Sequence, residues 1–433
     1  MCAAAATSGS LAHPVPGTCK NGVPTRTHRS ATVRSQAKDG VSQVSNGTDG
    51  PARTILRGRA GYVLLAVGAA ASVAAVLAAP RAAAASASQV WPPFVLVAGL
   101  LLVGILADAD GLFLALGSRS SNLPGGGLVL FSMLLLLVAA TTAVLNLDTA
   151  VVFLTPILLQ AARERGLEDL PFLYGSVFMV NAGSLFLPGA NLTNLLVLSG
   201  QHVPGSIFAW RMLPASLGAT AVTAAVLVVW FRRPLRAIPR PVAEGPAPLR
   251  MGLGLLGTGV AATLVIALPA PALPVLGVGV LFTGLAVLRG RIRPSVVVAV
   301  VHPALLCGLC GFAVAVGTLT RVWAAPQDLL HSLGRWGTAA TGAVASVAIN
   351  NLPAAVLLAP HATAHPRALL LGLDLGPGLA VSGSLSALLW LQIARRAGAR
   401  PSARTYSLIG IVLVPLAITT ALALTLLLAP RGF

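Results

Sequence analysis

The chain has 433 residues, of which 56% are hydrophobic and only 9% are charged, and its formal net charge is +18. A soluble domain usually carries about a quarter charged residues, so this chain has too few to cover a water-facing surface. Most of its perimeter must face lipid. The composition excludes a soluble enzyme and predicts an all-α polytopic membrane protein.

The first 60 residues are predicted to form a disordered, basic N-terminal tail. They are rich in Ser, Thr, Gly and Ala, and they carry eight Lys and Arg residues against Asp39 and Asp49. They show no apolar periodicity, and such a segment cannot bury enough surface to fold. The composition superficially resembles a transit peptide. Translation from a later start codon, which would leave the tail out, is the alternative.

Apolar runs follow one another closely from Tyr62 onward. We expect membrane spans near 62–80, 92–117, 171–199, 208–231, 251–268, 273–288, 295–317, 367–393 and 405–428. Most of these runs approach the ~20 residues that cross the hydrocarbon core of a bilayer. Two further regions, 127–162 and 335–360, have polar clusters at their centres and do not fit as single crossings.

Arginines lie in short clusters between the apolar runs, as in cytoplasmic loops under the positive-inside bias, and not on one face as nucleic-acid binding requires. The clusters are Arg232, Arg233, Arg236 and Arg240; Arg289, Arg291 and Arg293; and Arg395, Arg396, Arg400 and Arg404. If 127–162 and 335–360 are re-entrant hairpins and the N-terminus is cytoplasmic, 23 of the 29 Lys and Arg residues lie inside. We therefore predict these two hairpins, an inner or plasma membrane location and no nucleic-acid partner.

The two hairpins would open to opposite faces, and each is followed by an apolar segment interrupted by polar residues. Residues 191–196, Asn-Leu-Thr-Asn-Leu-Leu, align without a gap with 384–389, Ser-Leu-Ser-Ala-Leu-Leu. We interpret this as a weak repeat of inverted topology, which is common in secondary transporters. The predicted units are a tail over 1–60, a first transmembrane repeat over 61–240, a cytoplasmic linker over 241–250 and a second repeat over 251–433.

Two Pro-Gly pairs, Pro188–Gly189 and Pro377–Gly378, are predicted to break transmembrane helices. Non-helical backbone at membrane depth is tolerated only where something other than lipid satisfies its N–H and C=O groups. The half-helix ends would then face a shared cavity, in which side chains replace the hydration shell of a small solute. The candidate substrate-binding residues are Asn146, Thr149, Asn191, Thr193, Asn194, Asn350, Asn351, Ser382, Ser384 and Ser386.

These side chains have an alternative role, because Ser, Thr and Asn also bond neighbouring helices in membrane bundles. That role is favoured for a lone Ser or Thr, and the binding role is favoured for the Asn clusters in the symmetric breaks. Asp148 and Asp374 are candidates for a coupling ion, since an ionisable group at membrane depth costs about 2.5–3.5 kcal/mol on insertion scales. A helix cap is the alternative for Asp374.

Other signatures of chemistry are missing from the sequence. Cys2, Cys19, Cys307 and Cys310 give no disulfide framework. Cys307 and Cys310 are first interpreted as packing residues, with a thiol site for a soft metalloid as the alternative. His302, His361 and His365 lack metal-ligand spacing, and no Walker A motif is present. We expect no catalytic residue, no metal and no cofactor, so an ion gradient or a separate subunit must supply the energy.

Several stretches carry a family resemblance. They are Asp374-Leu-Gly-Pro-Gly with 383–391, Gly-Ser-Leu-Ser-Ala-Leu-Leu-Trp-Leu; 350–353, Asn-Asn-Leu-Pro; 146–150, Asn-Leu-Asp-Thr-Ala, with 154–157, Leu-Thr-Pro-Ile; Ser184-Leu; and Asn191-Leu-Thr-Asn. Together they resemble the arsenite efflux permeases, the arsenical pump membrane protein family of the ion transporter superfamily, over about residues 90–428. The chain departs from that family in the Asn-Leu-Asp-Thr of its first hairpin, in its long tail and in one missing N-terminal helix.

The resemblance implies paired re-entrant hairpins in two repeats, alternating access and often a dimer. For the arsenite branch it implies export of arsenite or antimonite against proton entry, sometimes with a soluble ATPase subunit. The first hypothesis is therefore a proton-coupled secondary transporter that exports a small oxyanion or metalloid. The second is a sodium- or proton-coupled carboxylate or anion transporter of the same superfamily, related to divalent-anion/sodium symporters and citrate carriers, with sodium near Asn146 and Asn350.

Overall fold

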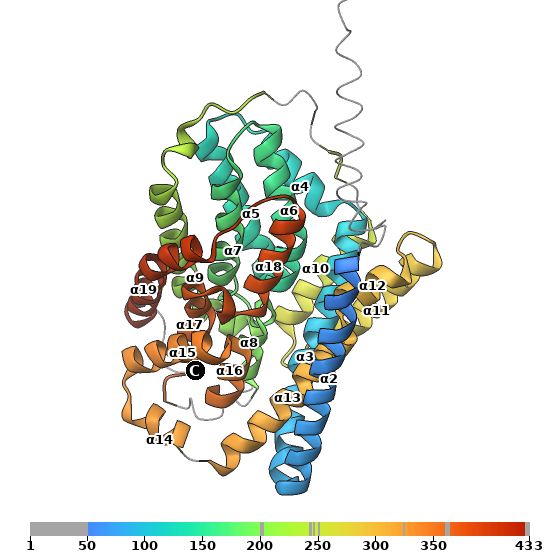
Figure 1. Ribbon diagram of the computed structural model, residues 1–433, viewed down its shortest axis with the longest axis vertical. Coiled ribbons are helices and arrows are strands. Elements are labelled where there is room, and N and C mark those ends of the chain that lie inside the picture. Colours follow the sequence, from blue (N-terminus) through green and yellow to red (C-terminus); the bar gives the residue numbers. More distant parts are fainter. Residues whose placement is uncertain are drawn as a thin grey trace, which may run out of the picture. The chain divides into compact units, whose positions relative to one another are not determined.

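The computed structural model describes residues 51–199, 203–241, 245, 247–249, 252–323, 325–359 and 364–428. Contacts divide the chain into two units, 1–54 and 55–433. Residues 1–50 of the predicted tail and half of the predicted linker over 241–250 lie outside the described residues. The described part of the chain is helical, without a strand (Figure 1), and it therefore has the all-α architecture that the composition predicts.

The first helices differ in their bounds from the predicted spans. The described part of α2 (Pro51–Ala78) includes residues 51–60 of the segment predicted as tail. The predicted span 92–117 is wrong as a single element, because α3 (Pro80–Ala109) and α4 (Leu112–Ser121) replace it. The chain turns between them at Gly111, whose φ of 78° is readily adopted by glycine.

The remaining elements of the first half surround two interruptions. They are α5 (Gly127–Val144), α6 (Leu147–Glu164), α7 (Asp169–Gly183), the short 3-10 turn η1 (Pro188–Ala190), α8 (Leu192–Leu198), α9 (Gly205–Trp230) and η2 (Pro234–Arg236). α5 and α6 pack against each other as a hairpin, and α7, η1 and α8 form a broken helix.

The second half begins with α10 (Leu253–Ala267), α11 (Ala272–Leu288), α12 (Pro294–Val301) and α13 (Pro303–Val322). The predicted span 295–317 lies within one candidate membrane span over Pro294–Val322, but His302, with a φ of 47°, divides this span into α12 and α13. The residue before a proline is biased away from the α region, and Pro303 follows directly.

The elements that follow repeat the plan of a hairpin and a broken helix. They are α14 (Ala325–Ser332), α15 (Arg335–Ile349), α16 (Asn351–Leu358), α17 (Pro366–Leu375), the turns η4 (Gly376–Leu379) and η5 (Val381–Gly383), α18 (Leu385–Arg396) and α19 (Ala403–Leu428). α15 and α16 pack together as the second hairpin, and α17 to α18 form the second broken helix.

Equivalent elements of the two halves make equivalent contacts. α5 packs on α7 and α7 on α9, just as α15 packs on α17 and α17 on α19. Contacts between the halves also correspond, because α6 packs on α18 and α16 packs on α8. α5 and α6 lie in the upper part of Figure 1, and α15 and α16 lie in the lower part. The orientation of the two halves relative to a bilayer stays a prediction.

Six helices or helix pairs of the described chain are long and apolar enough to cross a membrane. α3 is the most buried of them, whereas α2 and the pair α12–α13 bury little of their apolar surface within the chain. Side chains such as Leu77 on α2 and Val322 on α13 are exposed. Apolar surface of this extent is stable against lipid and not against water, so the chain is a polytopic membrane protein.

α19 approaches the second helix break through a glycine. A Cβ atom built on Gly410 would lie 1.9 Å from the carbonyl oxygen of Gly378. Beside this contact, the Tyr406 hydroxyl donates a hydrogen bond to the Pro377 carbonyl at 3.1 Å. The close approach lets α19 satisfy and cover backbone that the break leaves without helical partners.

We expect Gly410→Ala to destabilise the protein, because the new methyl group must displace the backbone at Gly378. Overpacking of this kind costs typically about 1–3 kcal/mol, which would lower the thermal unfolding midpoint of the purified protein in detergent. Gly277→Ala on α11 is the matched control, since a Cβ atom there meets nothing within 4 Å. Equal midpoints for the two variants would contradict the tight contact.

Candidate functional site

The tip of the first hairpin is built around an asparagine cap. Asn146 has extended backbone angles and ends the break between α5 and α6, and its Oδ1 accepts a hydrogen bond from the Thr149 N–H at 2.6 Å. An N-cap of this kind stabilises a helix by about 1 kcal/mol. Asn146 Nδ2 and Thr149 Oγ1 are buried, and neither has a hydrogen-bond partner within the described chain. Asp148, in the first turn of α6, is half-buried.

The tip of the second hairpin has the same kind of cap in a different backbone conformation. Asn350 has a positive φ of 74°. With a ψ of 149° this conformation lies outside the left-handed helical region and is strained for a residue with a side chain. Asn350 Oδ1 accepts from the Leu352 N–H at 3.4 Å, and its Nδ2 donates to the Ser382 carbonyl at 3.0 Å. Asn351 follows as a buried residue. This tip therefore bonds to the break in its own half.

The first helix break is closed by two asparagines. Pro188 and Gly189 lie in η1, and Asn191 caps α8 by accepting from the Thr193 N–H at 3.3 Å. Asn194 Nδ2 donates to the carbonyls of Ser184 at 2.8 Å and Leu187 at 3.3 Å. Those carbonyls have left the helical pattern, so Asn194 supplies the partner that lipid cannot.

The second break has two consecutive 3-10 turns in place of one. Pro377 and Gly378 lie in η4, and Ser384 caps α18 by accepting from the Ala387 N–H at 3.1 Å. Ser382 is exposed, and its carbonyl, not its hydroxyl, receives the bond from Asn350. Ser384 and Ser386 are buried.

Each half supplies a carboxylate that the other half holds. Asp374, at the end of α17, is only 1% exposed, and its Oδ1 accepts from Asn191 Nδ2 at 2.9 Å and from the Thr193 hydroxyl. In the equivalent arrangement, Asp148 Oδ1 accepts from the Ser386 hydroxyl. All three donors belong to the first turn, or the cap, of the half-helix that follows a break. Sequence reasoning selected these residues but did not predict how they pair.

The bonded residues form three groups. One joins Asp374 to Asn191 and Thr193, one joins Asp148 to Ser386, and one joins Asn350 to Ser382. Two further polar residues escaped the sequence-based site prediction. They are Asn181, which is buried in α7, and Tyr406 of α19. The only sequence feature that could have identified them is a polar or hydroxyl group inside an apolar run. Cys307 and Cys310 lie on α13, outside these groups.

Two buried acceptor atoms belong to residues that bond to the first break or lie just after it. Asp374 Oδ2 and Asn194 Oδ1 have no hydrogen-bond partner among the residues that the structure describes. A carboxylate oxygen and an amide oxygen can only accept, and a buried acceptor without a partner costs free energy. Each of these atoms can therefore accept a hydrogen bond from a bound solute or contact a cation, and the carboxylate can also take up a proton.

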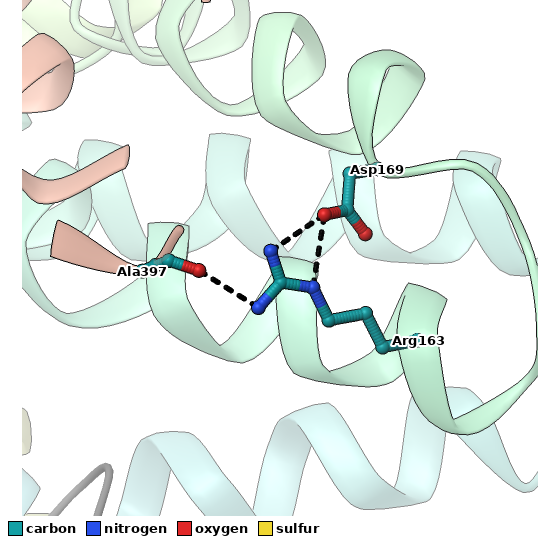
Figure 2. A network of polar contacts seen from close by, with 3 residues as sticks. All are labelled: Arg163, Asp169 and Ala397. Carbon is teal, nitrogen blue, oxygen red and sulfur yellow. Dashed lines mark hydrogen bonds and ion pairs between the residues drawn. The ribbon is translucent and has the colours of Figure 1, made fainter. Parts of the chain in front are cut away.

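An ion pair at one end of the bundle holds three of these helices together (Figure 2). Arg163, at the end of α6, donates from Nε and Nη2 to Asp169 Oδ2 at 2.9 and 2.6 Å and from Nη1 to the Ala397 carbonyl at 2.8 Å. Deeper in the bundle, Trp390 Nε1 of α18 donates to the Leu173 carbonyl of α7 at 2.9 Å. α6, α7 and α18 are thus connected across the two halves.

A polytopic helical chain with two hairpins, two broken helices and carboxylates bonded between its halves is built as a membrane transporter and not as an enzyme. Its sequence over residues 55–394 matches the family model described as citrate transporter. The chain belongs to the citrate transporter family.

Relatives with assigned names support the same class. The arsenical pump membrane proteins of Yersinia enterocolitica and Escherichia coli are 28% and 27% identical to the chain over 376 residues, which is 78% of this chain and 87% of each relative. The crystal structure of the YdaH transporter of Alcanivorax borkumensis has a TM-score of 0.52 at 14% identity, with 79% of this chain and 86% of that chain covered. This second likeness concerns the fold alone.

The contact between Asp148 and Ser386 can be tested by crosslinking. In a chain without its native cysteines, Asp148→Cys combined with Ser386→Cys should react with a short bifunctional thiol reagent. If a protease site is placed within 241–250, cleavage separates the two halves of an uncrosslinked chain, whereas a crosslinked chain keeps its two fragments joined. Asp148→Cys combined with Ser382→Cys is the control, since Ser382 lies beside Asn350. Equal crosslinking of both pairs, or of neither, would show that the helices are arranged differently.

Proposed function

We propose that this chain is a secondary active transporter that exports a small oxyanion or metalloid, with arsenite or antimonite as the best candidate. The observation that carries the proposal is the exchange of carboxylate partners between the halves, Asp374 with Thr193 and Asp148 with Ser386. The half-helix after each break is bonded to a carboxylate of the other half. Each half therefore presents polar groups to the other, which is the arrangement that alternating access requires.

The chemistry of these surfaces suits an uncharged hydroxide. Neutral arsenite carries three hydroxyl groups, which both donate and accept hydrogen bonds. Asn146 Nδ2, Thr149 Oγ1 and Asn194 Oδ1 supply buried donor and acceptor atoms without partners of their own in the described part of the chain. The cationic side chains of lysine and arginine are missing from the three bonded groups. The names of the two bacterial relatives agree with this substrate.

Proton coupling is assigned to Asp374 and Asp148. A proton on Asp374 Oδ2 would turn a buried acceptor atom into a donor. The change of charge in a medium of low dielectric constant alters the stability of the contact between the halves. A coupling ion can drive transport only through such a difference between two states.

The proposal includes the topology and assembly that the sequence favours. The halves over 61–240 and 251–433 are inverted repeats with re-entrant hairpins, and the N-terminus and the linker over 241–250 are cytoplasmic in an inner or plasma membrane. The working form is a homodimer in lipid, and a soluble ATPase subunit is a further partner that the arsenite branch uses in some cases.

Arsenite accumulation tests the substrate. Cells that lack their own exporter should accumulate less arsenite when they express the chain, and Asn191→Ala should abolish this protection because it removes a donor to Asp374 and the cap of α8. Asn351→Ala should act in the same direction. Thr263→Ala, an exposed residue that bonds within α10, is the control. Unchanged accumulation with the well-expressed native chain would reject arsenite.

The alternative function is a sodium- or proton-coupled carboxylate transporter, which the family match favours. Proteoliposomes separate the two. An imposed pH gradient should drive arsenite flux through the native chain, and Asp374→Asn should remove the gradient dependence because its amide cannot exchange a proton at neutral pH. Sodium-dependent citrate flux without arsenite flux would establish the alternative. Gradient-driven arsenite flux that persists in Asp374→Asn would remove this residue from coupling.

A further inference from the structure

Two glycines at the starts of the helix breaks meet equivalent residues of the two hairpins. A Cβ atom on Gly183, the last residue of α7, would lie 2.9 Å from Ala139 Cα, and one on Gly376, directly after α17, would lie 2.5 Å from Ala343 Cα. The residue three positions after each alanine is a further contact, a threonine in the first hairpin and a serine in the second. The packing of the hairpins therefore aligns Gly183 with Gly376.

This alignment pairs Asn181 with Asp374, because each residue lies two positions before its glycine. The half-helices after the breaks support the same pairing. Residues 191–196 and 384–389 align without a gap, and they are separated along the chain by the same number of positions as the two glycines. Asn181 is thus the counterpart of Asp374 in the first half, with an amide in place of the carboxylate.

Asn181 faces the second break from the opposite half. Phe178 precedes it by three residues and therefore lies on the same side of α7. The Phe178 ring stacks on the Tyr406 ring with the centroids 4.7 Å apart, and it would lie 3.5 Å from a Cβ atom on Gly378. The Asn181 amide lies beside the Tyr406 hydroxyl, which donates to the Pro377 carbonyl. Asn181 therefore belongs to the polar groups that surround the second break.

Asn181 carries a buried donor without an acceptor. The residue is 4% exposed, and its Nδ2 has no hydrogen-bond partner in the part of the chain that the structure describes. Ser384 and Ser386 hold the positions equivalent to the two donors to Asp374. Ser384, however, caps α18, and Ser386 bonds to Asp148. An amide nitrogen can only donate, and a buried donor without an acceptor costs free energy. The second break therefore offers a donor to an acceptor that the described residues do not supply.

We propose that Asn181 is a solute-binding residue at the second break, whose Nδ2 donates a hydrogen bond to an oxygen atom of the transported solute. The inference rests on the proposed function and assigns different tasks to two equivalent positions. Asp374 can exchange a proton at the first break, whereas the Asn181 amide keeps its donor at every pH of interest. A hydroxyl oxygen of arsenite and a carboxylate oxygen of citrate both accept such a bond, so Asn181 can serve either class of solute.

The test compares two variants of the full-length protein in proteoliposomes, with arsenite and citrate as the probes. Asn181→Leu removes the donor at nearly constant volume, and it should raise KM for the transported probe about tenfold through the loss of one hydrogen bond. Its kcat should change little, since the contact is made to the bound solute before the chain rearranges. Thr223→Val on α9 is the matched control and should keep the native KM, because the Thr223 hydroxyl is also buried without a partner in the described chain and lies outside the breaks.

Thermal unfolding separates solute binding from a structural role. Asn181→Leu removes an unpartnered polar group from the bundle, so its unfolding midpoint in detergent should equal or exceed that of the native chain. A native KM, or a lower midpoint, in Asn181→Leu would overturn the binding role of Asn181 and leave the transport function in place. A native chain that moves neither arsenite nor citrate would reject the proposed function itself, and with it the role of Asn181.

Discussion

A membrane offers no water to peptide groups, and this constraint governs the polar chemistry of the chain. Wherever a helix stops inside an apolar bundle, the freed N–H and C=O groups need a partner from the protein. Here the partners are short side chains. Asn146, Asn350, Asn191 and Ser384 cap the four helices that restart, and Asn194 bonds two of the carbonyls that the first break releases.

The same constraint explains why both carboxylates, the buried Asp374 and the half-buried Asp148, lie beside these caps. The first turn of a restarted helix has positive dipole character and presents hydroxyl groups, so it is a favourable place for a negative charge from the opposite half. Thr193 and Ser386 occupy equivalent positions in this respect. The helix breaks therefore create the polar groups and also determine which residues of the other half they bind.

Local features were predictable from the sequence, and long-range pairing was not. Pro188–Gly189 and Pro377–Gly378 identify the breaks because proline and glycine interrupt helices for local steric reasons. The limits of the spans were harder to predict, since α3 continues through Pro92 and Pro93 and His302 interrupts an apolar run. The bond between Asp148 and Ser386 joins residues 238 positions apart, and no periodicity in one sequence encodes such a contact.

Arg163 has a mechanical consequence for any transport cycle. Its guanidinium group fastens the end of the first hairpin to the start of α7 and to the residue after α18, so three helices from different halves are tethered at one end. A rearrangement that exposes the polar groups to the other side of the membrane must either release this tether or carry α6, α7 and α18 as one body. The moving unit would then cut across the sequence halves.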